Sequence, residues 1–203
     1  MNTKQDYAIA ALIGFLAGVF AIPTAVNNGL HTRIVLIALP LIVPILFIAG
    51  VYIGKFIARK FAFFEQLTKF FAVGFLNTAI DFGVLNLLSV VTGVTSGLIV
   101  GGVNIPGFSV AVGNSYFWNK FWVFQGRAGG GALQDFPRFL LVTLIGLFIN
   151  SGIIIILTTY ISAPSGISNT GWLNLAKIMA TAISFMWNFL GYKFIVFRPK
   201  HEQ

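Results

Sequence analysis

Long apolar windows fill this chain, and short groups of polar or charged residues separate them. A helix needs about 20 apolar residues to cross a hydrocarbon layer of about 30 Å. Six windows of roughly this length fit between the charges, at residues 7–25, 34–57, 67–91, 106–124, 136–160 and 172–197. The pattern predicts an all-α integral membrane protein with about six transmembrane helices.

Two of the windows contain features that affect whether they form transmembrane helices. In the fourth, the run Asn104–Gly107 interrupts the apolar stretch, so Pro106 either opens a helix or breaks one. The first window follows Lys4 and resembles a secretion signal, but residues 23–28 contain no convincing small-residue cleavage site. We therefore expect the first helix to be retained.

Composition agrees with a lipid environment. Of the 203 residues, 57% are hydrophobic and 9% are charged, against roughly 25% charged residues in soluble domains. The net charge of +8 comes from basic clusters between apolar windows, where such clusters set topology and attract anionic lipid, so we expect no nucleic-acid partner. With no Cys and two distant His, we expect no metal and no cofactor.

The positions of the basic residues predict orientation. Loops after the third and fifth windows carry no charge, and Arg33 is the clear exception to the bias. The segments expected on the other side are basic, so both termini are predicted to be cytoplasmic. The basic residues in those segments are Lys55, Arg59, Lys60, Lys69, Lys120, Arg127, Arg138, Lys193, Arg198 and Lys200.

An internal duplication organises the chain from residue 61 onward. Thr68–Val73 recurs 69 residues later as Pro137–Val142, and Lys120–Phe124 recurs 73 residues later as Lys193–Phe197. The order and spacing predict two parallel hairpin repeats, residues 67–124 and 136–197, forming a four-helix core at 61–203. A binding site at the interface between such repeats is a known transporter plan.

The first 60 residues lie outside the duplication and predict two additional helices with a linker. Gly14 with Gly18 and Gly50 with Gly54 have the small-xxx-small spacing of close helix packing, within the chain or in a homodimer. Basic residues alternate with Phe from Lys55 to Lys69, which predicts a short interfacial helix.

Four basic residues are candidates for holding an anion. Lys120 and Lys193 each lie about one turn inside the end of a helix, where they either snorkel to the headgroups or face each other and bind phosphate. Lys69 and Arg138 open the other two helices, at positions expected to be exposed, and either complete a basic ring or only orient the chain.

Polar groups lie deeper on the same helices. Asn114, Ser115 and Asn188 precede the lysines by five or six residues, and they suit either sugar hydroxyls or helix-to-helix hydrogen bonds. Asp81 lies twelve residues, about 18 Å, beyond Lys69 and one turn after Asn77. An acid at that depth is protonated, paired with a group such as Lys177, or couples protons.

The run Lys69–Asp81 that opens the first copy, with Asn119–Phe124 that closes it, resembles the GtrA-like family of small bacterial membrane proteins. The resemblance implies flipping of a polyprenyl-phosphate-linked sugar to the outer leaflet of the bacterial inner membrane, for cell-surface polysaccharide or glycolipid synthesis. By their positions, the resemblance implies that seven residues take part in this flipping: Lys69, Asn77, Asp81, Lys120, Arg138, Asn188 and Lys193.

Two rival functions fit the same sequence. One is a membrane partner that anchors a glycosyltransferase through basic surface residues such as Arg59, Lys60 and Arg127. The other is a proton-coupled exporter of small cations that depends on Asp81, against which the excess of cations argues. The chain itself is not expected to be an enzyme, because its five acids are scattered and offer no paired carboxylates for a metal-bound sugar nucleotide.

Overall fold

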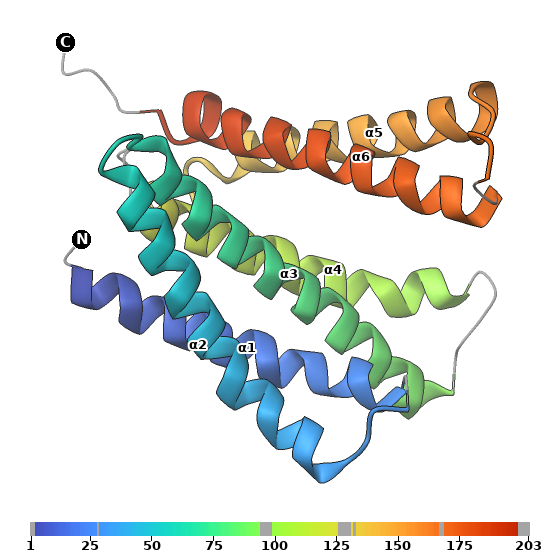
Figure 1. Ribbon diagram of the computed structural model, residues 1–203, viewed down its shortest axis with the longest axis horizontal. Helices are drawn as coiled ribbons and strands as arrows, with labels where there is room; N and C mark the ends of the chain where they lie inside the picture. The colour runs from blue at the N-terminus through green and yellow to red at the C-terminus, as the bar shows by residue number, and fades with distance from the viewer. Residues whose placement is uncertain are drawn as a thin grey trace. The chain divides into compact units, whose positions relative to one another are not determined.

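The structure is a computed structural model that describes residues 3–27, 29–93, 99–125, 131, 133–166 and 169–198. Its described residues form six α-helices, two of which continue directly into a π-helical turn (Figure 1). The elements are α1 (Thr3–Asn27), α2 (Arg33–Ala58), α3 (Phe63–Thr92), α4 (Ile99–Trp118), η1 (Asn119–Val123), α5 (Phe136–Tyr160), α6 (Asn169–Gly191) and η2 (Tyr192–Val196).

These helices confirm an all-α membrane protein. Backbone N–H and C=O groups must be satisfied within the segment in a lipid environment, and helices do this. Among the described residues, α1, α2 and α3 are long and apolar enough to cross a membrane, and shorter apolar stretches lie at Phe136–Asn150 and Ala182–Val196. The number of spans beyond these three stays a prediction.

The chain forms two compact units, Met1–Gln125 and Gly126–Gln203. The first unit holds α1 and α2 together with the first hairpin of the duplication, α3 and α4 with η1. The second unit holds the second hairpin, α5 and α6 with η2. The duplicated hairpins therefore belong to different units.

Glycine contacts bring α1 against α2 in the first unit. A Cβ on Gly14 would lie 2.6 Å from Cα of Pro44, and one on Gly18 would lie 2.5 Å from the carbonyl oxygen of Leu39. The prediction that these two helices pack on each other is confirmed at both glycines. Gly54 instead packs against Thr68 of α3, and Gly50 has open space where its Cβ would be.

The far end of α1 is fixed to α3 by an amide cluster. Asn27 donates a hydrogen bond to Oδ1 of Asn86 over 2.7 Å, and Nδ2 of Asn86 lies 3.2 Å from Oγ1 of Thr24. Nearby, Gly83 leaves room for the backbone of Phe20, where a side chain would collide with the carbonyl oxygen. Such polar pairs satisfy groups that lipid cannot.

Two details of the predicted helices are wrong. Pro106 neither opens nor ends a helix, because it lies inside α4, as membrane helices tolerate. The segment from Lys55 to Lys69 forms no separate interfacial helix, because α2 continues to Ala58 and α3 begins at Phe63. Its basic groups instead lie over neighbouring rings, with Arg59 5.5 Å from the centre of the Phe56 ring.

Candidate functional site

The two lysines that are predicted to bind phosphate have the same backbone conformation. Lys120 is the second residue of η1 and Lys193 the second residue of η2. Each π-turn closes with the N–H of a phenylalanine, Phe124 to the Asn119 carbonyl at 2.9 Å and Phe197 to the Tyr192 carbonyl at 2.8 Å. Short π-turns occur often at functional sites, and here the duplication repeats one in both units.

Lys120 is buried within the first unit, with 3% of its surface exposed. Its ammonium lies 3.3 Å from the Tyr116 hydroxyl, one turn earlier, and 5.6 Å from the centre of that ring. The stem therefore lies back along the helix and does not extend straight to the headgroup level.

Lys193 is half-buried in the second unit. Its ammonium lies 5.9 Å from the centre of the Phe189 ring and 5.4 Å from that of Phe194. Phe189 is the repeat equivalent of Tyr116, so both lysines turn toward an aromatic ring four residues earlier. The duplication thus preserves the direction of the side chain as well as the backbone turn.

Lys69 lies in a charged cluster at one end of the first unit, which we call the basic end. Its Nζ is 2.8 Å from Oδ1 of Asp6 and 3.0 Å from Oε1 of Glu65. Lys55 completes the cluster, 2.6 Å from Oδ2 of Asp6. The expectation that Lys69 is exposed is wrong: its side chain is 1% exposed, because α1 brings Asp6 over it.

Trp122 of η1 joins the same cluster. Its indole N–H donates a hydrogen bond of 3.0 Å to Oδ1 of Asp6, and the Lys69 ammonium lies 5.8 Å from the centre of its ring. The charged cluster therefore connects α1, α2 and α3 to the π-turn that carries Lys120. Removing one partner from such a buried group leaves a charge without compensation.

The second unit lacks this cluster at the equivalent positions. Arg138, the counterpart of Lys69, is exposed, as the sequence predicts. Ile195, the counterpart of Trp122, is 51% exposed, against 1% for Trp122. The additional helix α1 accounts for this difference between the copies, because it provides Asp6 to the first copy.

Polar side chains deeper in the first unit bond to one another, once between α3 and α4 and otherwise along α4 and η1. Asn114 donates from Nδ2 to Oδ1 of Asn77 over 2.7 Å, and Trp118 donates to Oδ1 of Asn114 over 3.0 Å. Ser115 accepts from Nδ2 of Asn119, at 2.8 Å to its carbonyl and 3.2 Å to its hydroxyl. These groups form a polar layer between Lys120 and the middle of the bundle.

The second unit arranges the corresponding layer differently. Oδ1 of Asn188 is buried without a hydrogen-bond partner among the described residues. It packs where a Cβ of Gly146 would be, and Gly146 is the repeat equivalent of Asn77. Further from η2, Asn150 donates to Oγ of Ser184 over 3.2 Å. The two copies therefore carry different polar groups at equivalent positions of the repeat.

Asp81 lies beyond this layer, against α4. A Cβ on Gly107 would lie 3.2 Å from Oδ1 of Asp81 and 2.8 Å from its backbone oxygen. That Oδ1 is buried and has no hydrogen-bond partner among the described residues. The proposed partner Lys177 has a side chain outside the described residues, so this pairing stays a prediction.

The sequence did not point to the contacts that Asp6, Trp122 and Tyr116 make with the predicted site lysines and their π-turn. One signal was available, since Glu65 precedes Lys69 by four residues and such spacing favours an ion pair. Asp6 carried no comparable signal, because its partners lie on other helices. Among the described residues, no cluster of three or more His, Cys, Asp or Glu side chains offers a metal site.

Comparison with known proteins supports the resemblance. The sequence profile of the family described as "GtrA/DPMS, transmembrane domain" matches residues 69–197. The chain is similar to the uncharacterized membrane protein YngA of Bacillus subtilis (strain 168), with 33% identity over 148 residues, which is 72% of this chain and 88% of that protein. No solved structure matches the chain. The chain belongs to the GtrA/DPMS transmembrane-domain family.

Proposed function

We propose that the protein flips a polyprenyl-phosphate-linked sugar from the cytoplasmic to the outer leaflet of a bacterial inner membrane. Lys120 and Lys193 bind the phosphate, and Arg138 attracts it at the mouth. Asn77, Asp81, Asn114, Ser115 and Asn188 bind the sugar hydroxyls. Membership of the GtrA/DPMS family supports a role with lipid-linked sugars, and the proposed activity makes and breaks no bond.

One observation carries this proposal: a lysine occupies the second position of a π-turn in both copies of the duplicated hairpin. A phosphate entering a low-dielectric region needs nearby positive charge, since burying an isolated anion costs several kcal/mol or more. An ammonium is a compact point charge that suits phosphate. Each copy of the hairpin therefore provides one lysine in the same setting for this role.

The polar layer supports a sugar next to the phosphate. Asn77 and Asn114 form an amide pair one to two turns from Lys120, and Asn188 is at a similar distance from Lys193. Amide groups can exchange a bond with each other for bonds to hydroxyls. Lys69 has a positioning role in this account, because its ammonium already contacts two carboxylates.

Transport in proteoliposomes tests the proposal. A labelled polyprenyl-phosphate sugar is placed in one leaflet, and its arrival in the other leaflet is measured. We expect Lys120→Ala with Lys193→Ala to abolish transport, and Lys120→Arg to retain part of it. Arg33→Ala removes a basic residue at the first position of α2, far from the basic end, and serves as the control. Full activity of the double variant would refute the proposal.

A second candidate function, the anchoring of a membrane glycosyltransferase, is favoured by the turn between α2 and α3. Arg59 and Lys60 are exposed there, outside the segment that matches the family profile. This function predicts that Arg59→Ala with Lys60→Ala abolishes co-purification of the transferase, while the two lysine variants above have no effect. Flipping predicts instead that the two lysine variants abolish transport and that Arg59→Ala with Lys60→Ala does not.

A further inference from the structure

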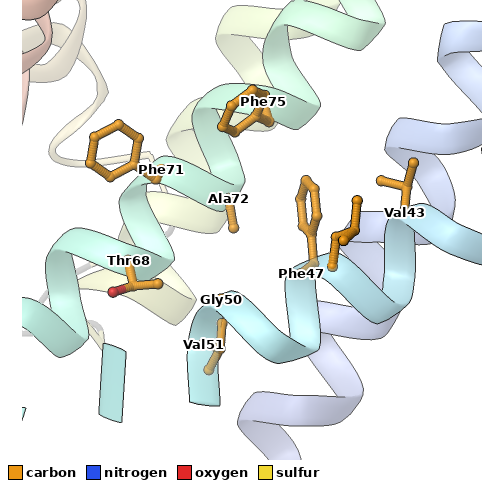
Figure 2. Close-up of a pocket in the computed structure, with 9 residues that line it drawn as sticks. Val43, Phe47, Gly50, Val51, Thr68, Phe71, Ala72 and Phe75 are labelled. Atoms are coloured by element: carbon orange, nitrogen blue, oxygen red, sulfur yellow. The ribbon is translucent and has the colours of Figure 1, made fainter. Parts of the chain in front are cut away.

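An apolar groove runs between α2 and α3 in the first unit. Figure 2 shows its floor and walls, which are formed by Val43, Leu46, Phe47, Gly50 and Val51 of α2 and by Thr68, Phe71, Ala72 and Phe75 of α3. Its volume is about 390 Å³. The helix α2 lies outside the segment that matches the family profile, so the groove is an addition to the family core.

A second hollow continues this groove toward the other end of the unit. It has a volume of about 500 Å³ and shares Phe75 with the first. Phe47 meets Phe75 across the groove, with 6.3 Å between ring centres. The two helices diverge from the turn that joins them (Figure 1).

One face of α3 lines both hollows. Its residues recur every three or four positions, from Thr68 to Phe82, and large phenylalanines alternate with small residues. At 1.5 Å per residue, these fourteen steps extend over about 21 Å, most of the thickness of a hydrocarbon layer. A long, flexible hydrocarbon chain fits such a track. The residues of this face are Thr68, Phe71, Ala72, Phe75, Thr78, Ala79 and Phe82.

The volumes agree with a chain of many carbons. A dry apolar cavity of about 150 Å³ binds one benzene molecule. By the same measure, 390 Å³ in the first hollow accommodates on the order of fifteen carbons, which is three isoprene units. The second hollow adds room for more of the same chain.

The groove begins at the basic end. Thr68 is followed by Lys69, whose ammonium lies over the ring of Trp122, two residues beyond Lys120 in η1. Lys55 lies one turn beyond Val51 on α2, and Arg59 and Lys60 follow it, exposed. A lipid whose chain lies in the groove therefore has its negative headgroup at the level of the exposed Arg59 and Lys60, since Lys55 and Lys69 are already paired with carboxylates.

We infer that the α2–α3 groove binds the prenyl chain of the carrier lipid, an inference that rests on the proposed function. A chain held in the groove keeps the phosphate close to the level of Lys120 before flipping. The groove thereby gives α1 and α2 a role in retaining the lipid that the duplicated core alone lacks.

Photolabelling of the full chain in nanodiscs tests the inference. The probe is a polyprenyl phosphate that carries a diazirine on its chain. We expect it to label residues of the groove, and we expect excess polyprenyl phosphate to prevent this labelling while excess phosphatidylglycerol does not. Equal competition by the phospholipid, or labelling spread evenly over the outer helices, would overturn the inference.

A matched pair of glycine variants adds a second measurement. A Cβ at Gly50, which lines the groove, would meet nothing within 4 Å, and a Cβ at Gly113 of α4, outside the groove, has the same open space. Gly50→Phe is expected to weaken probe binding about tenfold, the effect of excluding about two methylenes. Gly113→Phe should leave binding unchanged. Equal effects of the two variants would count against the inference.

Flipping by the wild-type protein is measured in parallel, so that the two claims can fail separately. Groove labelling that polyprenyl phosphate prevents supports the inference even if no sugar is flipped. Flipping without groove labelling overturns the inference and leaves the proposed function standing.

Discussion

The carboxylate of Asp6 and the ammonium of Lys69 form a buried ion pair, with 2.8 Å between Oδ1 and Nζ and both side chains 1% exposed. Asp6 lies on α1, outside the duplication, and Lys69 opens the first copy. The indole of Trp122 bonds the same carboxylate oxygen. The N-terminal helix is therefore linked chemically to the π-turn that carries Lys120.

Asp6→Ala is expected to destabilise the protein strongly. The substitution leaves Lys69 buried without its acid from α1 and also removes the nearest carboxylate of Lys55, so the expected loss is about 3–5 kcal/mol. Heating in detergent while following tryptophan fluorescence measures it. Asp6→Leu combined with Lys69→Met replaces the pair by apolar groups and should recover much of the loss. An unchanged Tm in Asp6→Ala would contradict the importance of the cluster.

Trp122→Ala and Ile195→Ala compare equivalent positions of the two copies. Trp122 is 1% exposed and bonds Asp6, so its loss should cost ~3 kcal/mol and lower the Tm by roughly 6–12 °C. Ile195 is 51% exposed, and its truncation should change stability by about 0.5 kcal/mol or less. Similar Tm shifts for both variants would mean that the contact with Asp6 of α1 does not make Trp122 more important for stability than Ile195.

Gly18→Ala tests the contact between α1 and α2. The added methyl would lie 2.5 Å from the carbonyl oxygen of Leu39, so the helices must separate, at a cost of about 1–3 kcal/mol. Gly113→Ala meets no atom within 4 Å and should stabilise its helix by about 0.5–1 kcal/mol. The difference in Tm between the two variants is the measurement, and a more stable Gly18→Ala would refute the predicted clash.

Asn77→Ala separates transport from stability. It removes the acceptor of Asn114, which should cost about 1–3 kcal/mol, and it removes an amide from the proposed sugar path. Asn86→Ala breaks a similar amide pair between α1 and α3, away from that path. We expect both variants to lower the Tm, and only Asn77→Ala to slow flipping per folded molecule. Equal flipping rates would remove Asn77 from the path.

Much of the helical architecture could be predicted from apolar windows. The window 136–160 has the same bounds as α5, and the recurrence of Lys120–Phe124 as Lys193–Phe197 corresponds to the two π-turns. Windows and repeats succeed here because helix length follows from membrane thickness, and equivalent sequences adopt equivalent turns. Pro106 was harder to predict, since a membrane helix accommodates a proline that would end a soluble helix.

The partners of the charged residues could not be predicted from spacing alone. Lys69 was expected to be exposed because basic residues at helix ends usually face headgroups, yet Asp6 of another helix covers it. The sequence contains five acids, and nothing in their order shows which one reaches a given lysine. Contacts between distant helices depend on packing at glycines such as Gly14 and Gly18, which sets how helices cross.

Direct binding of polyprenyl phosphate tests most sharply whether Lys120 and Lys193 hold the lipid headgroup. The dissociation constant is measured in nanodiscs for the wild type, for Lys120→Met with Lys193→Met, and for Arg33→Met as the control. We predict that the double variant binds at least about 100-fold more weakly, as expected when charges that contact a buried anion are removed. The control should match the wild type. A double variant with the wild-type dissociation constant would contradict the account.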